Sequence, residues 1–181
     1  MVLIYARNKH VGAEYLAKGQ VRVRAAVEDT LFSGWVEIDF ALDTLAVLAA
    51  RGEVRRGIVS ACLGGPELLS RIVGLRVAQG MTRTVDGLVG GANGCTTMAN
   101  LVMECCHAVV SIRRRDERRR LAGAGVTRED HLRSLLRPGS RLRNSCVAFA
   151  EASPLLERLG LAAGERQIVA AEDGGADLQQ E

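Results

Sequence analysis

The sequence is organised around one glycine-crowded stretch, residues 89–95, that leads into a long apolar segment. Three glycines in five residues precede Cys95. Glycine lets the backbone adopt positive φ and approach itself or a ligand closely. From residue 96 to about residue 119, apolar side chains recur at helical spacing. The pattern predicts a tight loop that opens a long central helix.

Cys95 stands where this loop meets the helix, so it is the candidate catalytic residue. Thr96 or Thr97 is predicted as the N-cap, since both can accept a hydrogen bond from an unpaired helix amide. The partial positive charge of a helix N-terminus favours a thiolate over a thiol, and free amides beside it form an anion or oxyanion site. The alternative is a glycine turn with Cys95 as a small core residue. The predicted ligand-binding residues are Gly90, Gly91, Gly94, Thr96, Thr97 and Asn100.

The predicted helix has an apolar face and a polar stripe. The stripe faces water or lines a pocket, and it contains Glu104 and His107, three residues apart as in metal-binding helical bundles. These two residues are further catalytic candidates, for general acid–base chemistry. His107 is about 18 Å of helix rise from Cys95 and cannot act on it directly. The core positions are Met98, Leu101, Val102, Cys105, Val109 and Ile112, and the stripe is Thr97, Asn100, Glu104, His107 and Ser111.

Other base candidates for Cys95 must be brought in by the fold. They are His10, His131 and a carboxylate such as Asp86, and no spacing in the sequence selects among them.

Composition narrows the class of protein. The 181 residues are 48% hydrophobic but only 3% aromatic, so the core must be aliphatic, and a nucleotide-stacking pocket is not expected. The net charge of +3 does not imply a polyanionic partner. No apolar run is long enough to span a membrane, and the N-terminus lacks a signal-peptide layout. We therefore expect a cytoplasmic protein with reduced cysteines and no membrane partner. The high content of Arg, Ala, Gly and Val with almost no Lys predicts a bacterial source.

The N-terminal half predicts an antiparallel meander. A lead-in strand is expected within residues 1–19, and residues 20–28 and 35–42 alternate apolar and polar side chains. Residues 51–53 are predicted as a turn before a fourth strand at 54–61. The fold class is therefore α+β, with the meander packed against the long central helix and smaller flanking helices. One domain is predicted over residues 1–161, followed by a mobile acidic tail at 162–181.

The flanking elements follow from local signals. Pro66 is predicted to start a helix that ends at Gly74, and residues 75–89 are predicted as a connection with a short strand. Thr127 is predicted to cap a helix that stops before Pro138, and a short helix follows Ser153. Residues 141–149 are predicted to return as a strand that carries Cys146.

Six arginines fall within residues 113–120, at the end of the central helix. Cations stabilise the negative end of a helix dipole, and no aromatic residues interleave them, which argues against a nucleic-acid interface. We expect a solvated helix end, and the sequence does not identify a partner for it.

The chain resembles the bacterial family catalogued as domain of unknown function 2889 over about residues 20–150. The most specific match is the Gly-Gly-x-x-Gly-Cys-Thr run at residues 90–96. The departures are Thr97 and Asn100, where the family pattern has a histidine and an acidic residue. If the family's chemistry needs these two groups, the chain has lost them or moved them to Glu104 and His107. The other matching parts are residues 21–54, Cys62, residues 72–77 with Gly80, and residues 145–148.

These features predict a small enzyme that acts on a small organic substrate, acyl or apolar, at the loop around Cys95, by thiol or general acid–base chemistry. The alternative is a non-catalytic module that binds a small molecule, a metal or an iron–sulfur cluster through Cys62, Cys95 and Cys146, the cysteines that fit the family pattern. The sequence identifies no cofactor, and it is compatible with a homo-oligomer.

Overall fold

The computed structural model describes residues 3–17 and 19–162. The chain forms two compact units, one up to Glu117 and one from Arg118 onward, and each is described by itself. The predicted tail lies outside the described residues apart from Ala162. That residues 1–161 form a single domain stays a prediction.

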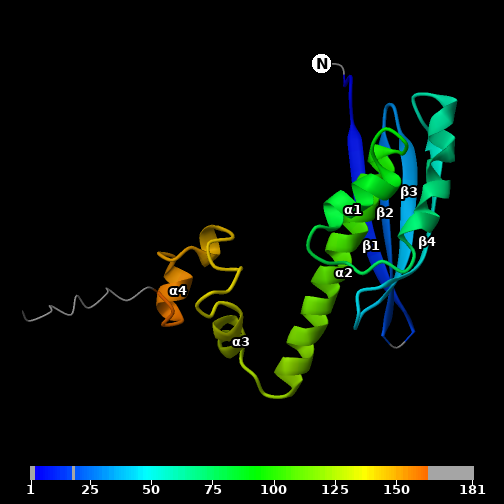
Figure 1. Cartoon of the computed structure of the whole chain (residues 1–181). Coiled ribbons are helices and arrows are strands. Elements are labelled where there is room, and N and C mark those ends of the chain that lie inside the picture. The colour runs from blue at the N-terminus through cyan, green and yellow to red at the C-terminus, as the bar shows by residue number, and fades with distance from the viewer. Residues whose placement is uncertain (1–2, 18, 163–181) are drawn as a thin grey trace, which may run out of the picture. The chain divides into compact units, whose positions relative to one another are not determined.

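The first unit contains a four-stranded antiparallel sheet in the order β1-β2-β3-β4, which confirms the predicted meander (Figure 1). In β2 and β3 every second side chain is buried, as the alternating pattern predicts. Val36, Ile38 and Phe40 are fully buried on one face. The strands are β1 (Arg7–Ala17), β2 (Gln20–Asp29), β3 (Ser33–Ala41) and β4 (Val47–Arg56).

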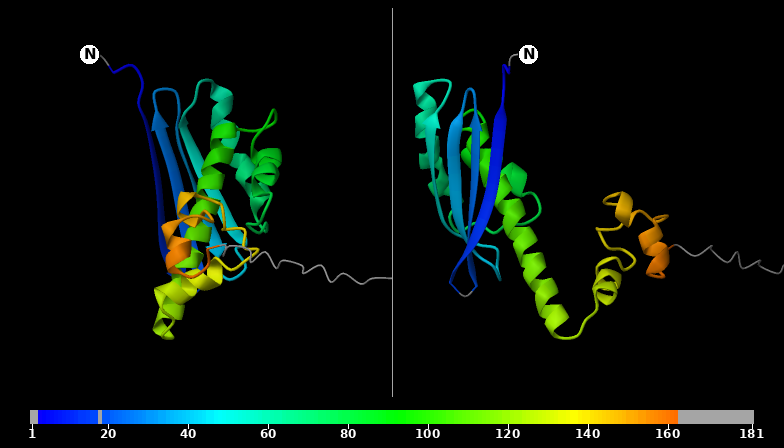
Figure 2. Two further views of the ribbon diagram at one scale, coloured as in Figure 1. Left: turned by 90° about the vertical axis from the view of Figure 1, so that its left-hand side faces the viewer. Right: turned by 180° about the vertical axis from the view of Figure 1, so that it is seen from behind.

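The long helix α2 (Thr96–Gly123) lies across the inner face of this sheet (Figures 1 and 2). Its buried side chains meet the apolar face of the strands in one aliphatic core, so the predicted α+β class is confirmed. The Cys105 thiol is buried there and donates to the carbonyl of Val23 at 3.7 Å. On the same helix, Glu104 pairs with Lys9 at 2.8 Å, and Asp116 accepts from the Tyr15 hydroxyl at 2.7 Å. Both contacts join α2 to β1.

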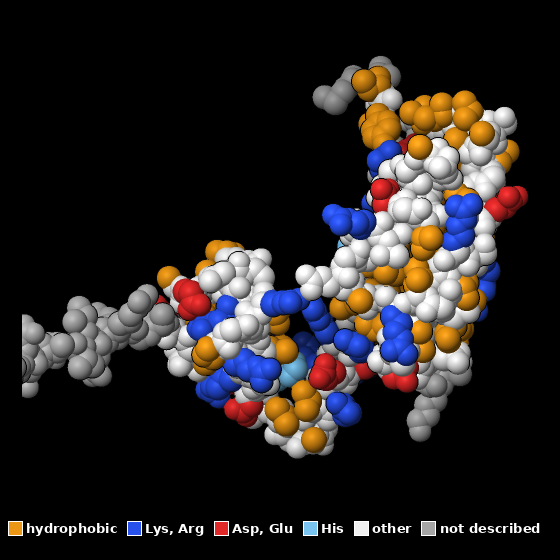
Figure 3. Space-filling model, viewed as in Figure 1, with side chains coloured by type: hydrophobic (Ala, Val, Ile, Leu, Met, Phe, Trp, Pro, Cys, Tyr) orange, Lys and Arg blue, Asp and Glu red, His pale blue; other side chains and the backbone are white. Residues whose placement is uncertain are grey.

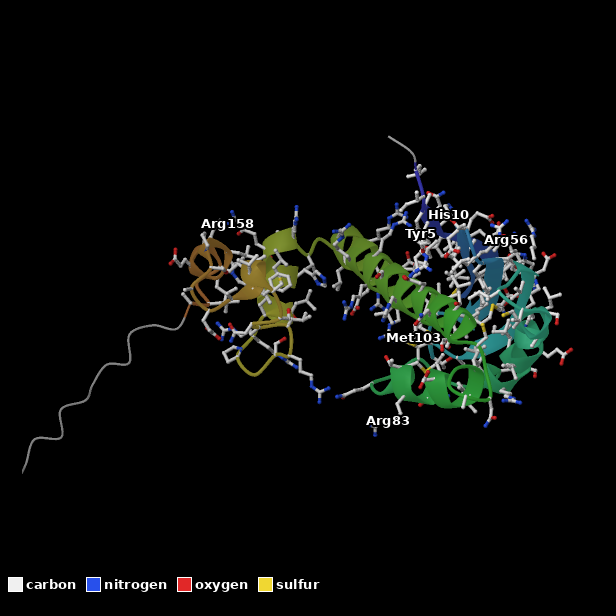
Figure 4. The ribbon with its side chains drawn as sticks, turned by 90° about the horizontal axis from the view of Figure 1, so that it is seen from above. Tyr5, His10, Arg56, Arg83, Met103 and Arg158 are labelled. Carbon is white, nitrogen blue, oxygen red and sulfur yellow. The ribbon has the colours of Figure 1, made fainter. Side chains whose placement is uncertain are left out.

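Two shorter helical elements complete the first unit. The 3₁₀ helix η1 (Ser60–Ile72) packs against β4, and α1 (Met81–Val89) buries Met81, Val85 and Val89 in the core. Arg83 projects from α1, and Met103 lies on the side of α2 toward α1 (Figure 4). Residues 74–77 run beside residues 45–47, with Val47 donating to the carbonyl of Leu75 at 2.8 Å.

Several predicted boundaries are wrong, for one physical reason. Residues 51–53 belong to β4 and are not a turn, because Gly52 allows η1 and α2 to pack closely against the middle of that strand. Residues 75–89 contain the helix α1, and η1 starts at Ser60, with Pro66 inside it. In each case tertiary packing overrides a local glycine or proline signal.

Gly52 marks the closest approach of three elements. A Cβ built at Gly52 would lie 2.6 Å from the carbonyl oxygen of Trp35, 2.8 Å from Leu69 Cδ1 and 3.1 Å from Met98 Cε. These atoms belong to β3, η1 and α2. No side chain fits at this position without moving backbone or core atoms.

The outer face of the sheet carries charged residues that pair across strands. Arg22 binds Asp39 at 2.8 Å and Glu37 at 3.4 Å, and Arg51 also pairs with both carboxylates. Arg24 stacks on the Trp35 ring at 4.3 Å. Opposite charges on neighbouring strands support the register of the sheet.

Asp29 organises the end of the sheet near the N-terminus. Its side chain accepts from the amides of Leu31 and Phe32 at 2.8 and 2.7 Å and binds Arg7 at 2.7 Å. These amides and the guanidinium hold the pKa of the buried Asp29 carboxyl below its ordinary value. The ionised carboxylate therefore fixes the β2–β3 turn.

The second unit has its own small core of leucines. It contains the end of α2, α3 (Arg128–Leu135), the 3₁₀ turn η2 (Val147–Phe149) and α4 (Pro154–Arg158). Thr127 caps α3 by accepting from the amide of Asp130 at 3.1 Å, as predicted. The predicted strand at residues 141–149 is wrong, because this segment forms turns and η2. The core residues are Leu136, Leu156 and Leu159, with Leu132, Leu142, Phe149, Leu155 and Leu161 packed around them.

None of the helices in the described part of the chain has the length and apolar character needed to cross a membrane.

The substitution Gly52→Ala should destabilise the protein by about 1–3 kcal/mol, because the added methyl group overpacks the junction of β3, η1 and α2. Gly87→Ala is the matched control, since a Cβ there meets nothing within 4 Å and the residue lies in helix α1. The control should be neutral or more stable by about 0.5–1 kcal/mol. Urea denaturation measures both, and equal effects would contradict the close packing at Gly52.

The substitution Asp29→Asn should destabilise the protein most at neutral pH. The folded-state pKa of Asp29 is below its unfolded value, so its stabilisation is present above the ordinary aspartate pKa of about 3.9 and is lost as pH falls through the folded value. The difference in unfolding free energy between wild type and variant should therefore shrink from pH 7 to about pH 3. Urea denaturation at both pH values tests this, and a constant difference would refute it.

Candidate functional site

The glycine loop before α2 closes on itself. The amide of Cys95 donates to the carbonyl of Val89 at 2.7 Å, and that of Gly94 donates to the carbonyl of Gly91 at 3.3 Å. Gly91 has φ +65°, and a Cβ at Gly94 would collide with the carbonyl oxygens of Val89 and Gly90. The glycines therefore allow a tight turn that returns the chain to the end of α1.

Cys95 occupies the N-cap position of α2. The helix starts at Thr96, and the carbonyl of Cys95 accepts from the amide of Ala99 at 2.9 Å. The predicted threonine cap is therefore wrong, because the loop closure places the cysteine itself at this position. The amides of Thr96, Thr97 and Met98 stand in the first turn, where a helix provides no backbone partner.

Cys95 and Cys62 line the same surface hollow. It has a volume of about 450 Å³, is open to solvent, and both thiols are partly buried in its wall. Among the described residues that line it, Asn93 alone has a polar side chain besides the two thiols. The lining residues are Val59, Ala61, Cys62, Gly64, Gly65, Leu68, Ala92, Asn93, Gly94 and Cys95.

Glycines in η1 and before it bring the two cysteines close. A Cβ at Gly65 would lie 3.4 Å from Cys95 Cβ, and a Cβ at Gly57 would collide with Cys62. Cys62 precedes Gly65 by one turn of 3₁₀ helix, which rises by about 6 Å, so the Cβ atoms of Cys62 and Cys95 lie within about 10 Å of each other. In this structure both thiols are free.

The other predicted catalytic residues do not line this hollow. Glu104 and His107 lie about 14 and 18 Å further along the axis of the continuous helix α2. Glu104 forms its ion pair with Lys9, and His107 is exposed. His10 is on β1 and His131 on α3, while the Asp86 side chain lies against Gly90 at the back of the loop.

Among the predicted ligand-binding residues, only Gly94 lines the hollow. Gly90 is buried under the loop, and Thr97 is half-buried, whereas Gly91, Thr96 and Asn100 are exposed. The residues that sequence reasoning missed are those of η1 and the segment before it, above all Gly65 and Leu68. The sequence signal for these residues is the Gly-Gly pair after Cys62. This pair is typical of a break in a strand, but it also lets η1 pack close to Cys95.

The remaining three cysteines have different surroundings. Burial raises the pKa of the Cys105 thiol to about 12 and that of Cys106 to about 11. Cys146 is exposed and belongs to the second unit. Within residues 3–17 and 19–162, no group of three or more His, Cys, Asp or Glu side chains is placed to hold a metal ion.

A family model described as "Protein of unknown function (DUF2889)" matches residues 11–111. This range runs from β1 into α2 and includes both cysteines of the hollow, while Cys146 and residues 145–148 lie beyond it. No curated protein matches the chain. No solved structure matches it either.

The five cysteines should differ in their reaction with iodoacetamide in the folded protein. Cys62, Cys95 and Cys146 should be alkylated at pH 8, since each is at least partly exposed. Cys105 and Cys106 should stay unmodified up to pH 9, because burial keeps these thiols protonated and out of reach. Peptide mapping by mass spectrometry measures all five at once, with protein unfolded in urea as the reference. Early modification of Cys105 would contradict the packing of α2 on the sheet.

Proposed function

The chain belongs to the DUF2889 family, whose description names no activity, and we propose that it is a small enzyme that uses the Cys95 thiol on a small organic acyl substrate. The observation that carries this proposal is the position of Cys95. It is at the N-cap of a long helix, in the wall of an open hollow whose other lining residues are mostly apolar.

The first-turn amides of α2 suit the charge that acyl transfer develops. A thiolate attack on a carbonyl carbon places negative charge on the carbonyl oxygen, and preorganised N–H donors stabilise it. The amides of Thr96, Thr97 and Met98 are the donors nearest to Cys95 along the chain. The positive end of the helix dipole favours the oxyanion as well.

The chemistry of the hollow favours a thiol route over a carboxylate–imidazole route. Of the lining residues that the structure describes, Cys62 is the only other titratable one, and Glu104 and His107 are not part of the lining. In the proposed step, the Cys95 sulfur forms a bond to the acyl carbon, the bond to the leaving group breaks, and the thiol proton passes to solvent. A second nucleophile, such as water, then takes the acyl group from sulfur.

The apolar lining fits an acyl group or a similar small apolar moiety. Val59, Ala61, Leu68 and Ala92 supply this lining, and a cavity of this volume is within the range of small-molecule sites. We also propose that the protein is cytoplasmic and of bacterial origin, as the composition of the whole chain predicts.

Acylation by p-nitrophenyl acetate tests the proposal. The full chain should release one p-nitrophenolate per molecule in a burst and gain one acetyl group on Cys95, located by peptide mass spectrometry. Cys95→Ser should reduce the burst rate by roughly tenfold or more, because the hydroxyl is a far weaker nucleophile.

Cys146→Ser is the matched control, since it removes an exposed thiol outside the hollow, and it should leave the burst unchanged. Acetylation on Cys146 alone, or equal acetylation of all exposed thiols, would refute the proposal. The circular dichroism melting curves of both variants establish that each is folded. The metal-binding alternative would be favoured by a different result. In that case wild type binds zinc, Cys62→Ser and Cys95→Ser do not, and no acetylation occurs.

A further inference from the structure

The second unit is rich in arginine. Residues 118–162 contain nine arginines and four carboxylates, and blue side chains lie at several places on this unit (Figure 3). Over the whole unit, residues 118–181, ten arginines stand against nine carboxylates, so the placement of the arginines matters more than the net charge. Three of the arginines line one hollow.

This hollow lies between the last turns of α2 and the start of α3 and has a volume of about 340 Å³. Arg118 and Arg119 line it from α2, and Arg128 and the half-buried His131 line it from α3. The rest of its lining is small or apolar apart from Thr127. The lining residues are Arg118, Arg119, Leu121, Ala122, Val126, Thr127, Arg128 and His131.

The carboxylates of α3 do not neutralise these three arginines. Arg133 binds both Asp130, at 3.0 Å, and Glu129, at 3.5 Å. The Thr127 hydroxyl also donates to Asp130 at 2.6 Å, and this hydrogen bond together with Arg133 holds the pKa of Asp130 below its ordinary value. Within the described part of the chain, no carboxylate lies within ion-pair distance of the guanidinium groups that line the hollow.

The geometry of the backbone adds to the positive charge. The hollow includes Thr127, the N-cap of α3, and therefore lies at the positive end of that helix dipole. Arginine presents planar donors that bind phosphate oxygens in pairs. Three arginines, a histidine and a helix N-terminus thus line one hollow of ligand size.

We propose that this hollow binds a phosphate-bearing anion, with Arg118, Arg119 and Arg128 as the binding residues. The phosphate belongs to a free phosphorylated small molecule or to the backbone of a nucleic acid. The small volume of the hollow favours a compact terminal phosphate or diphosphate, and no Phe, Tyr or Trp is among the described residues that line it to stack bases. This site is separate from the Cys95 hollow and does not depend on the function proposed there.

Isothermal titration calorimetry of the full chain with inorganic pyrophosphate tests the proposal. Wild type should bind one pyrophosphate, and the double variant Arg118→Gln/Arg119→Gln and the single variant Arg128→Gln should each bind at least about tenfold more weakly. The double variant Arg114→Gln/Arg115→Gln removes the same charge from the same helix, outside the lining of the hollow, and should bind as wild type does.

Equal weakening in the two double variants would overturn the proposal, because it would show attraction to net charge alone. So would an absence of saturable pyrophosphate binding by wild type. Competition with a single-stranded RNA 12-mer distinguishes the sources of the phosphate. RNA that displaces pyrophosphate at lower concentration, with the same dependence on Arg118, Arg119 and Arg128, supports the site with a phosphodiester ligand. RNA that displaces it only at higher concentration supports the site with a free phosphorylated ligand.

Discussion

The first unit depends on the close approach of β4, η1 and α2 at Gly52. Leu69 of η1 and Met98 of α2 both reach the space that a side chain at Gly52 would occupy. Because Met98 is in the first turn of α2, this contact fixes where the helix begins. It also fixes η1 beside that helix end, so that a Cβ built at Gly65 would lie 3.4 Å from both Met98 Cγ and Cys95 Cβ.

The same junction explains why the cysteines of the first unit have different properties. Cys105 and Cys106 belong to the face of α2 that covers the sheet, where burial keeps them neutral. Cys95 is one residue before the helix and Cys62 is on the neighbouring 3₁₀ helix η1. Both line the hollow that is open to solvent. A single packing arrangement thus produces two structural thiols and two thiols available for chemistry.

The sequence was sufficient for the parts of the fold that follow from simple periodicity. Alternation in residues 20–28 and 35–42 predicted two central strands, and helical spacing after Cys95 predicted α2. The predicted positions of β4 and η1 are wrong, because Gly52 resembles a turn signal and Pro66 resembles a helix-start signal. Only the packing partners from distant segments show that neither residue has that role here.

The candidate site was predicted in part, for a related reason. The glycine run located Cys95 and its loop, since positive φ and close backbone approach are local properties. The contribution of η1 depends on a contact between residues 65 and 95, which no local pattern encodes. Glu104 and His107 shared a polar stripe with residues near Cys95, but helix rise separates them from the hollow.

We propose that the fold makes Cys95 a reactive thiol and does not merely bury it. The most direct test is the rate constant for alkylation of Cys95 by iodoacetamide in the native protein, divided by that in urea-unfolded protein under the same pH and reagent concentration. A ratio well above one is expected, because the hollow leaves the sulfur accessible and the first-turn amides of α2 can hold the carbonyl oxygen of the reagent beside it. A ratio at or below one would contradict the account and identify Cys95 as an ordinary, partly buried core residue.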